Sequence, residues 1–202
     1  MPSPAQGDLE GERLPVSLPP VIDAHIHVFA RPLFEAIWRW FEQYGWPIRY
    51  KLDADAVVAF LRSRGVSGMV LLHYAHKPGI ARAMNAFVAE VARRTPTAVG
   101  VATVHPDDLD PAAILAEGFA MGLRGVKLHC HVQCFGPDDA RLDAIEATWL
   151  LAEIVLVRTV GQQAIAAAMI TAPVVGSRSS APPPSSSGSP RMRCFQHCSP
   201  SF

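Results

Sequence analysis

The stretch that decides the fold is Val21-Ile-Asp-Ala-His-Ile-His-Val-Phe29, a short apolar run with two histidines one residue apart. Side chains on a β-strand alternate between its two faces, so residues i and i+2 point the same way. As a strand, this run projects His25 and His27 together, with Asp23 one step behind them on the same face. Two neutral imidazoles on one strand form half of a metal site, for zinc or another divalent ion that accepts imidazole.

Composition indicates a globular α/β chain and excludes several classes of function. Half of the 202 residues are hydrophobic, only 18% are charged, and the formal net charge is zero, with no block of Lys and Arg. Such a chain lacks the electrostatic footprint of a nucleic-acid or anionic-membrane binder. No secretory signal and no apolar run of membrane-spanning length are visible. By elimination we expect a cytoplasmic location.

Hydrophobic periodicity predicts strands that alternate with helices. Apolar runs favour strands at 21–29, 66–74, 98–105 and 125–132, and helical spacing favours helices at 31–44, 53–64, 78–94, 111–121 and 138–153. Gly65 and Gly122 are the expected helix stops, and Asp53 or Asp55 lies at a helix start. This order predicts a parallel sheet with right-handed crossovers.

Histidines collect towards the carboxyl ends of the predicted strands. The chain has eight histidines, and six fall at these ends: His25, His27, His73, His105, His129 and His131, with His76 just beyond the second strand. In parallel α/β folds, ligands bind at the carboxyl ends of the strands. Each of His73 and His105 either lines a pocket or caps its strand end through a backbone hydrogen bond, and the second role is favoured.

The stretch Lys127-Leu-His-Cys-His131 repeats the alternation of the first strand. It predicts Lys127, His129 and His131 on one face. A buried lysine beside imidazoles can act as a base when its pKa falls, bind a substrate carboxylate, or bridge metals if carboxylated. The structural alternative is a lysine paired with an acid such as Asp23 beneath the site.

Cysteines suggest a weaker alternative. The pairs Cys130/Cys134 and Cys194/Cys198 have a spacing that a zinc module tolerates, but on the strand interpretation Cys130 points away from the neighbouring histidines. No nucleophile elbow, glycine-rich phosphate loop or dinucleotide fingerprint is present.

Four segments resemble a known family. Residues 21–27 resemble the first strand of the amidohydrolase superfamily, and 73–79 (HYAHKPG), 103–108 (TVHPDD) and 122–129 (GLRGVKLH) resemble its amidohydrolase-related branch. That branch holds metal-dependent hydrolases and decarboxylases such as aminocarboxymuconate-semialdehyde decarboxylase. The resemblance covers roughly residues 20 to 145.

The resemblance implies a (β/α)8 TIM barrel with a divalent metal, zinc by first choice, at the carboxyl rim. His25 and His27 match the family's first-strand ligands, while Lys127 and His129 would line the pocket and orient substrate or stabilise negative charge. The family's later histidines and its aspartate on the eighth strand have no counterpart that we find. A complete barrel needs about 250 residues, so we expect a partial barrel of about four to five β/α units.

Composition divides the chain into three parts. We expect a flexible lead at 1–20, a partial barrel domain at 21–160 that ends in a fifth strand at 154–161, and at 161–202 an Ala-rich helix followed by a disordered Ser/Pro-rich tail. The abrupt change favours the hypothesis that a family-like gene was truncated or read out of frame around residues 143–155.

Two functional hypotheses follow. The first is a metal-dependent hydrolase or decarboxylase acting on a small, carboxylate-bearing molecule, with no nucleic-acid or membrane partner. The second is an inactive, truncated or frameshifted half-barrel that binds metal weakly or aggregates. Such a half-barrel leaves a strand edge uncovered, and a homo-oligomer could cover it.

Overall fold

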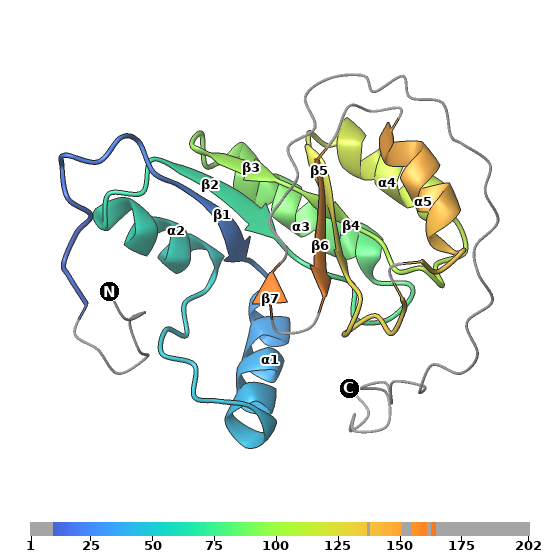
Figure 1. Ribbon diagram of the computed structural model, residues 1–202, viewed down its shortest axis with the longest axis horizontal. Coiled ribbons are helices and arrows are strands. Elements are labelled where there is room, and N and C mark those ends of the chain that lie inside the picture. Colours follow the sequence, from blue (N-terminus) through green and yellow to red (C-terminus); the bar gives the residue numbers. More distant parts are fainter. Residues whose placement is uncertain (1–9, 137, 151–154, 161–162, 165–202) are drawn as a thin grey trace, which may run out of the picture.

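The computed structural model describes residues 10–136, 138–150, 155–160 and 163–164 (Figure 1). Strands and helices alternate in the expected order: β1 (Ile22–His27), α1 (Arg31–Tyr44), α2 (Ala54–Ser63), β2 (Gly68–Leu72), α3 (Ala81–Arg93), β3 (Ala98–Gly100), β4 (Ala102–Thr103), α4 (Pro111–Ala120), β5 (Gly125–His129), α5 (Leu142–Leu150), β6 (Val155–Val160) and β7 (Gln163–Ala164). No helix in these ranges is both long and apolar enough to cross a membrane.

The strands form two sheets, and the chain passes directly from the last strand of one to the first strand of the other. The first has the order β1-β2-β3 and the second β4-β5-β6-β7, with every pairing parallel except that of β6 with β7. Val101 separates β3 from β4, and its amide still donates to Leu71 O at 3.1 Å. The predicted parallel sheet is therefore confirmed, and the third predicted strand passes from one sheet to the other at Val101.

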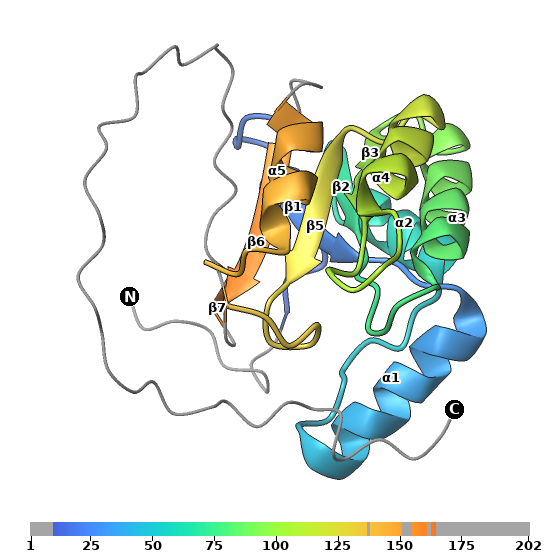
Figure 2. The same ribbon diagram turned by 90° about the vertical axis from the view of Figure 1, so that its right-hand side faces the viewer.

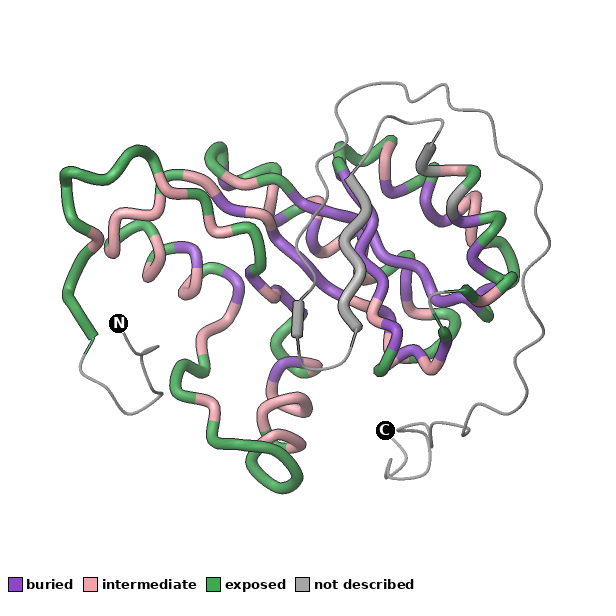
Figure 3. Tube along the Cα trace, viewed as in Figure 1, coloured by how far each residue is buried: buried purple, intermediate pink, exposed green. Residues whose placement is uncertain are grey.

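Helices pack on the strands and enclose the core. Figure 2 shows α3 and α4 side by side next to the strands, and both contact β4. The apolar run of β2 is nearly continuous because both of its faces are covered. Buried residues follow the central strands in Figure 3, and the core includes Leu71, Val104, Leu115, Val126 and Leu128.

Local signals explain where several helices begin and end. The Asp53 carboxylate accepts the Ala56 amide at 3.0 Å and caps α2, a contact that typically contributes about 1 kcal/mol. Gly65 and Gly122 have φ angles of +94° and +95°, which glycine adopts without steric cost, and they follow α2 and α4.

Helix α1 leaves the carboxyl end of β1 and projects from the sheet (Figures 1 and 2). Its aromatic stripe is anchored at one end, where Phe34 is buried and its ring lies 5.2 Å from that of Phe29 and 5.1 Å from that of Trp38. The rest of the stripe is only half-buried. This helix therefore begins beside the carboxyl end of β1, where the sequence predicts the site.

The end of the described chain differs from the prediction. An Ala-rich helix was expected from residue 161, but Gln163 and Ala164 form an antiparallel strand opposite Val160 and Thr159. Backbone N–H and C=O groups at the end of β6 can pair with a neighbouring strand. A helix pairs its backbone groups internally and could not form these bonds. The predicted Ser/Pro-rich tail and the pair Cys194/Cys198 lie outside the described residues.

The beginning of the chain carries no helix or strand between residues 10 and 20. It nevertheless contacts the domain, because the Leu14 amide donates to Arg64 O at 2.8 Å and Glu10 lies 3.2 Å from Arg49. The first nine residues of the expected lead lie outside the described part.

Candidate functional site

His25 and His27 meet at the carboxyl end of β1. Their Nε2 atoms lie 2.9 Å apart and their ring centroids 4.9 Å apart. The pairing of β1 with β2 shifts register between Asp23 and Ile26, an irregularity that re-aims side chains at a strand end. Asp23 Oδ1 accepts the His25 amide at 3.0 Å and fixes the backbone there.

Both imidazoles are held neutral by their surroundings. The pKa of His27 is lowered to about 3, mainly by burial and also by the charges of His25 and Lys127. Burial also lowers the pKa of His25, with the charge of Lys127 acting in the same direction. A neutral imidazole is the form that can bind a metal ion.

Lys127 and His129 come to the same place from β5. Lys127 is fully buried, and burial lowers its pKa to about 8. The pKa of His129 is lowered to about 4, mainly by burial and also by the charge of Lys127. The structure thus brings together all four predicted site residues, since His25 and His27 each lie within electrostatic range of Lys127.

The turn after β5 fixes the tautomer of His129. The Val132 amide donates to His129 Nδ1 at 3.3 Å, so a neutral ring carries its hydrogen on Nε2. Gln133 holds the same turn, because its Oε1 accepts the His129 amide at 2.6 Å and its Nε2 donates to Val104 O at 2.8 Å. His129 can therefore act as a hydrogen-bond donor.

Tyr74 lies between His27 on β1 and His129 on β5, and the sequence analysis did not predict it. Its ring centroid lies 5.6 Å from that of His27 and 4.9 Å from that of His129. Burial raises its pKa to about 12, which keeps the phenol neutral. The signal that could have found it is its place directly after the second strand, where only the histidines were considered.

The other histidines take different positions. His73 is buried on the α3 side, where its Nε2 lies 2.9 Å from Asn85 Oδ1. His105 caps its strand end, as favoured, since its amide donates to Asp108 Oδ2 at 2.8 Å and its Nδ1 accepts the Asp107 amide at 3.1 Å. His131 was expected on the face of Lys127, but β5 ends at His129 and His131 lies exposed in the following turn.

The possible metal ligands are two imidazoles. Within the described ranges, no group of three or more His, Cys, Asp or Glu side chains is placed to hold one ion. The donor set that the residues offer is therefore the Nε2 pair of His25 and His27. Cys130 is buried and Cys134 half-buried.

Comparisons with known proteins give a fold relationship. No family model matches the sequence, and no curated protein matches it. Among solved structures, an amidohydrolase II protein aligns with a TM-score of 0.57 at 17% identity, over 74% of this chain and 53% of the other.

Two structures of 5-carboxyvanillate decarboxylase from Novosphingobium aromaticivorans also align. The mutant form with bound manganese gives a TM-score of 0.56 at 17% identity, and another manganese complex gives 0.54 at 18%; each alignment covers 68% of this chain and 49% of the other. The chain spans about half the length of the structures it matches. Its mixed α/β fold with parallel sheets is similar to the fold of these amidohydrolase and decarboxylase structures over this partial length.

Proposed function

We propose that this chain carries the first-strand metal ligands and part of the substrate pocket of a metal-dependent hydrolase or decarboxylase. The fold would be a partial (β/α)8 barrel, and the substrate a small molecule with a carboxylate. The observation that carries the proposal is the His25/His27 pair, whose Nε2 atoms lie 2.9 Å apart beside Lys127 and His129.

The pair fits a divalent ion in its chemistry. Both rings are neutral, and both Nε2 atoms lie within reach of one ion at bond lengths of about 2.0–2.1 Å. Imidazole suits several divalent metals, so the ligand type does not single out zinc. The bound ion would lower the pKa of a coordinated water or polarise a carboxylate.

The other side chains provide charge and orientation. With a pKa of about 8, Lys127 stays mainly protonated at neutral pH, and a buried ammonium attracts a carboxylate. His129 would donate from Nε2 to a developing oxyanion. Tyr74, between His27 and His129, would exclude water from one side of the substrate.

Manganese is bound in the decarboxylase structures named above, and this supports a divalent ion here as well. We therefore propose manganese beside zinc as the ion to test. A cytoplasmic location and assembly with a second copy belong to the same proposal.

A second candidate is a non-catalytic chain that binds metal weakly. It is favoured by the described donor set, which provides two imidazoles and no third ligand. Two protein ligands hold an ion far less firmly than the three or four of typical catalytic and structural sites.

Metal binding by the full-length chain tests the proposal. Calorimetric titration with Mn²⁺ and with Zn²⁺ would be made on the unaltered chain, on His25→Ala and His27→Ala, and on His131→Ala as the matched exposed control. We expect both first-strand variants to lose binding at least about tenfold and the control to keep it. Equal binding by all four proteins would refute the assignment.

Turnover separates the two candidates. The manganese-loaded chain would be assayed for carbon dioxide release from aromatic carboxylates, 5-carboxyvanillate included, and for hydrolysis of simple esters. Turnover that Lys127→Met abolishes supports the enzyme. Metal binding without turnover on any of these compounds supports the non-catalytic chain.

A further inference from the structure

Side chains connect the two sheets beyond the point where the backbone changes from one to the other. β2 pairs with β3, β4 pairs with β5, and the Val101 amide still bonds the first sheet. Further along, the β2 end (residues 73–75) meets β4 through the side chains of Asn85 and Thr103. Both side chains are fully buried. These two residues therefore hold together the ends of strands that belong to different sheets.

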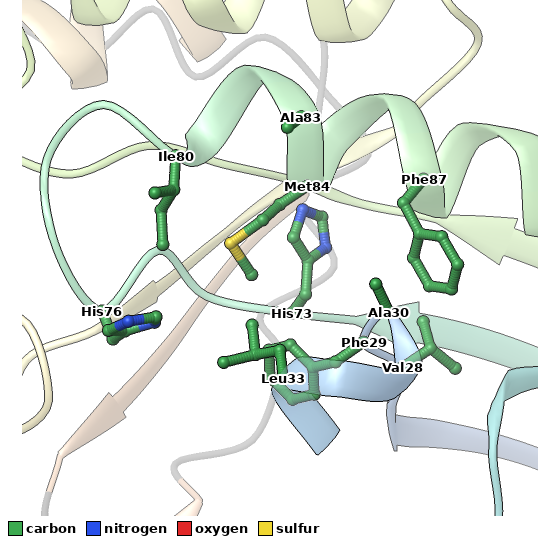
Figure 4. A pocket seen from close by; sticks show the side chains of 10 residues that line it. All are labelled: Val28, Phe29, Ala30, Leu33, His73, His76, Ile80, Ala83, Met84 and Phe87. Atoms are coloured by element: carbon green, nitrogen blue, oxygen red, sulfur yellow. The ribbon is translucent and has the colours of Figure 1, made fainter. Parts of the chain in front are cut away.

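Asn85 makes the first of these connections, from α3. Its Oδ1 accepts the Thr103 amide at 2.8 Å, and its Nδ2 donates to Thr103 O at 3.0 Å. The same Oδ1 lies 2.9 Å from His73 Nε2. Figure 4 shows the His73 ring directed towards α3, among the apolar side chains that line a pocket there. The Asn85 amide therefore fixes the backbone of Thr103 and ties it to the β2 end.

The Thr103 hydroxyl makes the second connection. Its Oγ1 accepts the Ala75 amide at 3.3 Å and donates to Lys127 O at 2.8 Å. An amide N–H only donates and a carbonyl oxygen only accepts, so the two bonds together fix the direction of the hydroxyl hydrogen. All three residues are fully buried. Without the hydroxyl, two buried backbone groups would each have one partner fewer, which costs free energy.

The two backbone groups adjoin residues of the candidate site. The Ala75 amide belongs to the peptide group that follows Tyr74, and the carbonyl is that of Lys127 itself. One hydroxyl therefore connects the backbone beside Tyr74 with the backbone of Lys127. The Tyr74 ring centroid lies 5.6 Å from that of His27 and 4.9 Å from that of His129. A movement of this backbone would therefore change both ring contacts.

We propose that Thr103 is a positioning residue of the candidate site, whose hydroxyl holds Tyr74 and Lys127 in place across the change of sheet. It thereby keeps the Tyr74 ring between His27 and His129. A hydroxyl suits this role because it donates to one group while it accepts from another. The inference rests on the proposed function in one respect, which is that the cluster is a site.

Fluorine NMR of the full-length chain labelled with 3-fluorotyrosine tests the position of Tyr74. The chain has three tyrosines, of which Tyr44 and Tyr50 are exposed, and Tyr74→Phe assigns the third signal. Without metal, Thr103→Val should shift the Tyr74 signal by more than its linewidth and leave the other two in place. Thr103→Ser keeps the hydroxyl and should restore the signal. Thr95→Val, at a buried threonine before the amino end of β3, is the matched control and should shift none.

An unmoved Tyr74 signal in folded Thr103→Val, or a Thr103→Ser protein that behaves like Thr103→Val, would overturn the proposal. The second result would show that packing by the threonine side chain, and not its hydroxyl, places the ring.

Hydrogen exchange at the Ala75 amide tests the hydroxyl bond directly. In the unaltered chain this amide should exchange at least about tenfold more slowly than that of the exposed Lys77. Thr103→Val should speed Ala75 exchange about three- to tenfold relative to the Val28 amide, which bonds Leu72 O, as expected for one net hydrogen bond. Ala75 exchange as fast as that of Lys77 overturns the proposal, even if Thr103→Val fails to fold.

Addition of Zn²⁺ to the labelled chain separates this inference from the proposed function. Zinc on His27 should shift the Tyr74 signal, because the two rings are in contact. Thr103→Ser should respond as the unaltered chain does. A Tyr74 signal that Zn²⁺ leaves unmoved in the unaltered chain would contradict His27 as a ligand. The metal-free comparison of Thr103→Val with Thr103→Ser would then still decide the role of Thr103.

Discussion

Replacement of Lys127 by methionine should stabilise the protein. The ammonium is fully buried and its pKa falls from 10.5 to about 8, so the folded state holds the proton less tightly than the unfolded state does. At about 1.4 kcal/mol for each pKa unit, the buried charge costs about 3 kcal/mol at pH 7. Methionine has a similar shape and carries no charge, so Lys127→Met removes most of this cost.

The stability gained by Lys127→Met should depend on pH in a specific way. Between pH 8 and 10.5 the unfolded lysine is still protonated while the folded one has lost its proton, so the unfolded state binds more protons. Stability of the unaltered chain therefore rises with pH through this window. The advantage of Lys127→Met should shrink from about 3 kcal/mol at pH 7 to near zero at about pH 11.

Urea unfolding followed by circular dichroism, in the presence of a chelator, measures this difference at each pH. Lys77→Met is the matched control, because Lys77 is exposed and follows the same rim. We expect the control to change the free energy of unfolding by less than about 0.5 kcal/mol at every pH. A Lys127→Met protein that is less stable than the unaltered chain at pH 7, or whose advantage does not change with pH, refutes the reasoning.

Three further predictions concern stability. Asn85→Ala should cost about 2–4 kcal/mol in urea unfolding, because it leaves His73 Nε2 and the Thr103 backbone groups buried without partners. Gly100→Ala should cost about 1–3 kcal/mol in the same assay, since a Cβ there would lie 2.7 Å from Leu123 Cδ2. Burial lowers the pKa of His73 to about 4, so the unfolded state takes up a proton first as the pH falls. The free energy of unfolding should therefore drop between pH 6.5 and 4. His73→Phe should flatten this part of the plot of stability against pH.

Local signals in the sequence were sufficient for the helices. The range 31–44 predicted for the first helix matches α1, the cap of α2 is Asp53, one of the two acids predicted at its start, and the stops at Gly65 and Gly122 are where the prediction has them. These features depend on a few neighbouring residues and on backbone sterics. They can therefore be predicted without knowledge of the tertiary fold.

The candidate site was predictable as a set of residues but not in its detail. The alternation rule brought His25 and His27 together, and the order of the strands added Lys127 and His129. Which side of the β2 end each residue faces depends on where the strand stops. For His73 a backbone cap was favoured, whereas its ring lies against the Asn85 side chain, and Tyr74 was overlooked. Such end positions depend on packing against α3 and β5, which periodicity does not describe.

The change of sheet at Val101 has a consequence for mechanics. His25, His27 and Tyr74 are carried by the first sheet and its β2 end, whereas Lys127 and His129 are carried by the second. A small molecule held between these two groups of residues would contact both sheets and restrict their relative movement. We expect this restriction to slow hydrogen exchange at the Val101 amide, so an amide remote from the ligand would report that the site is filled.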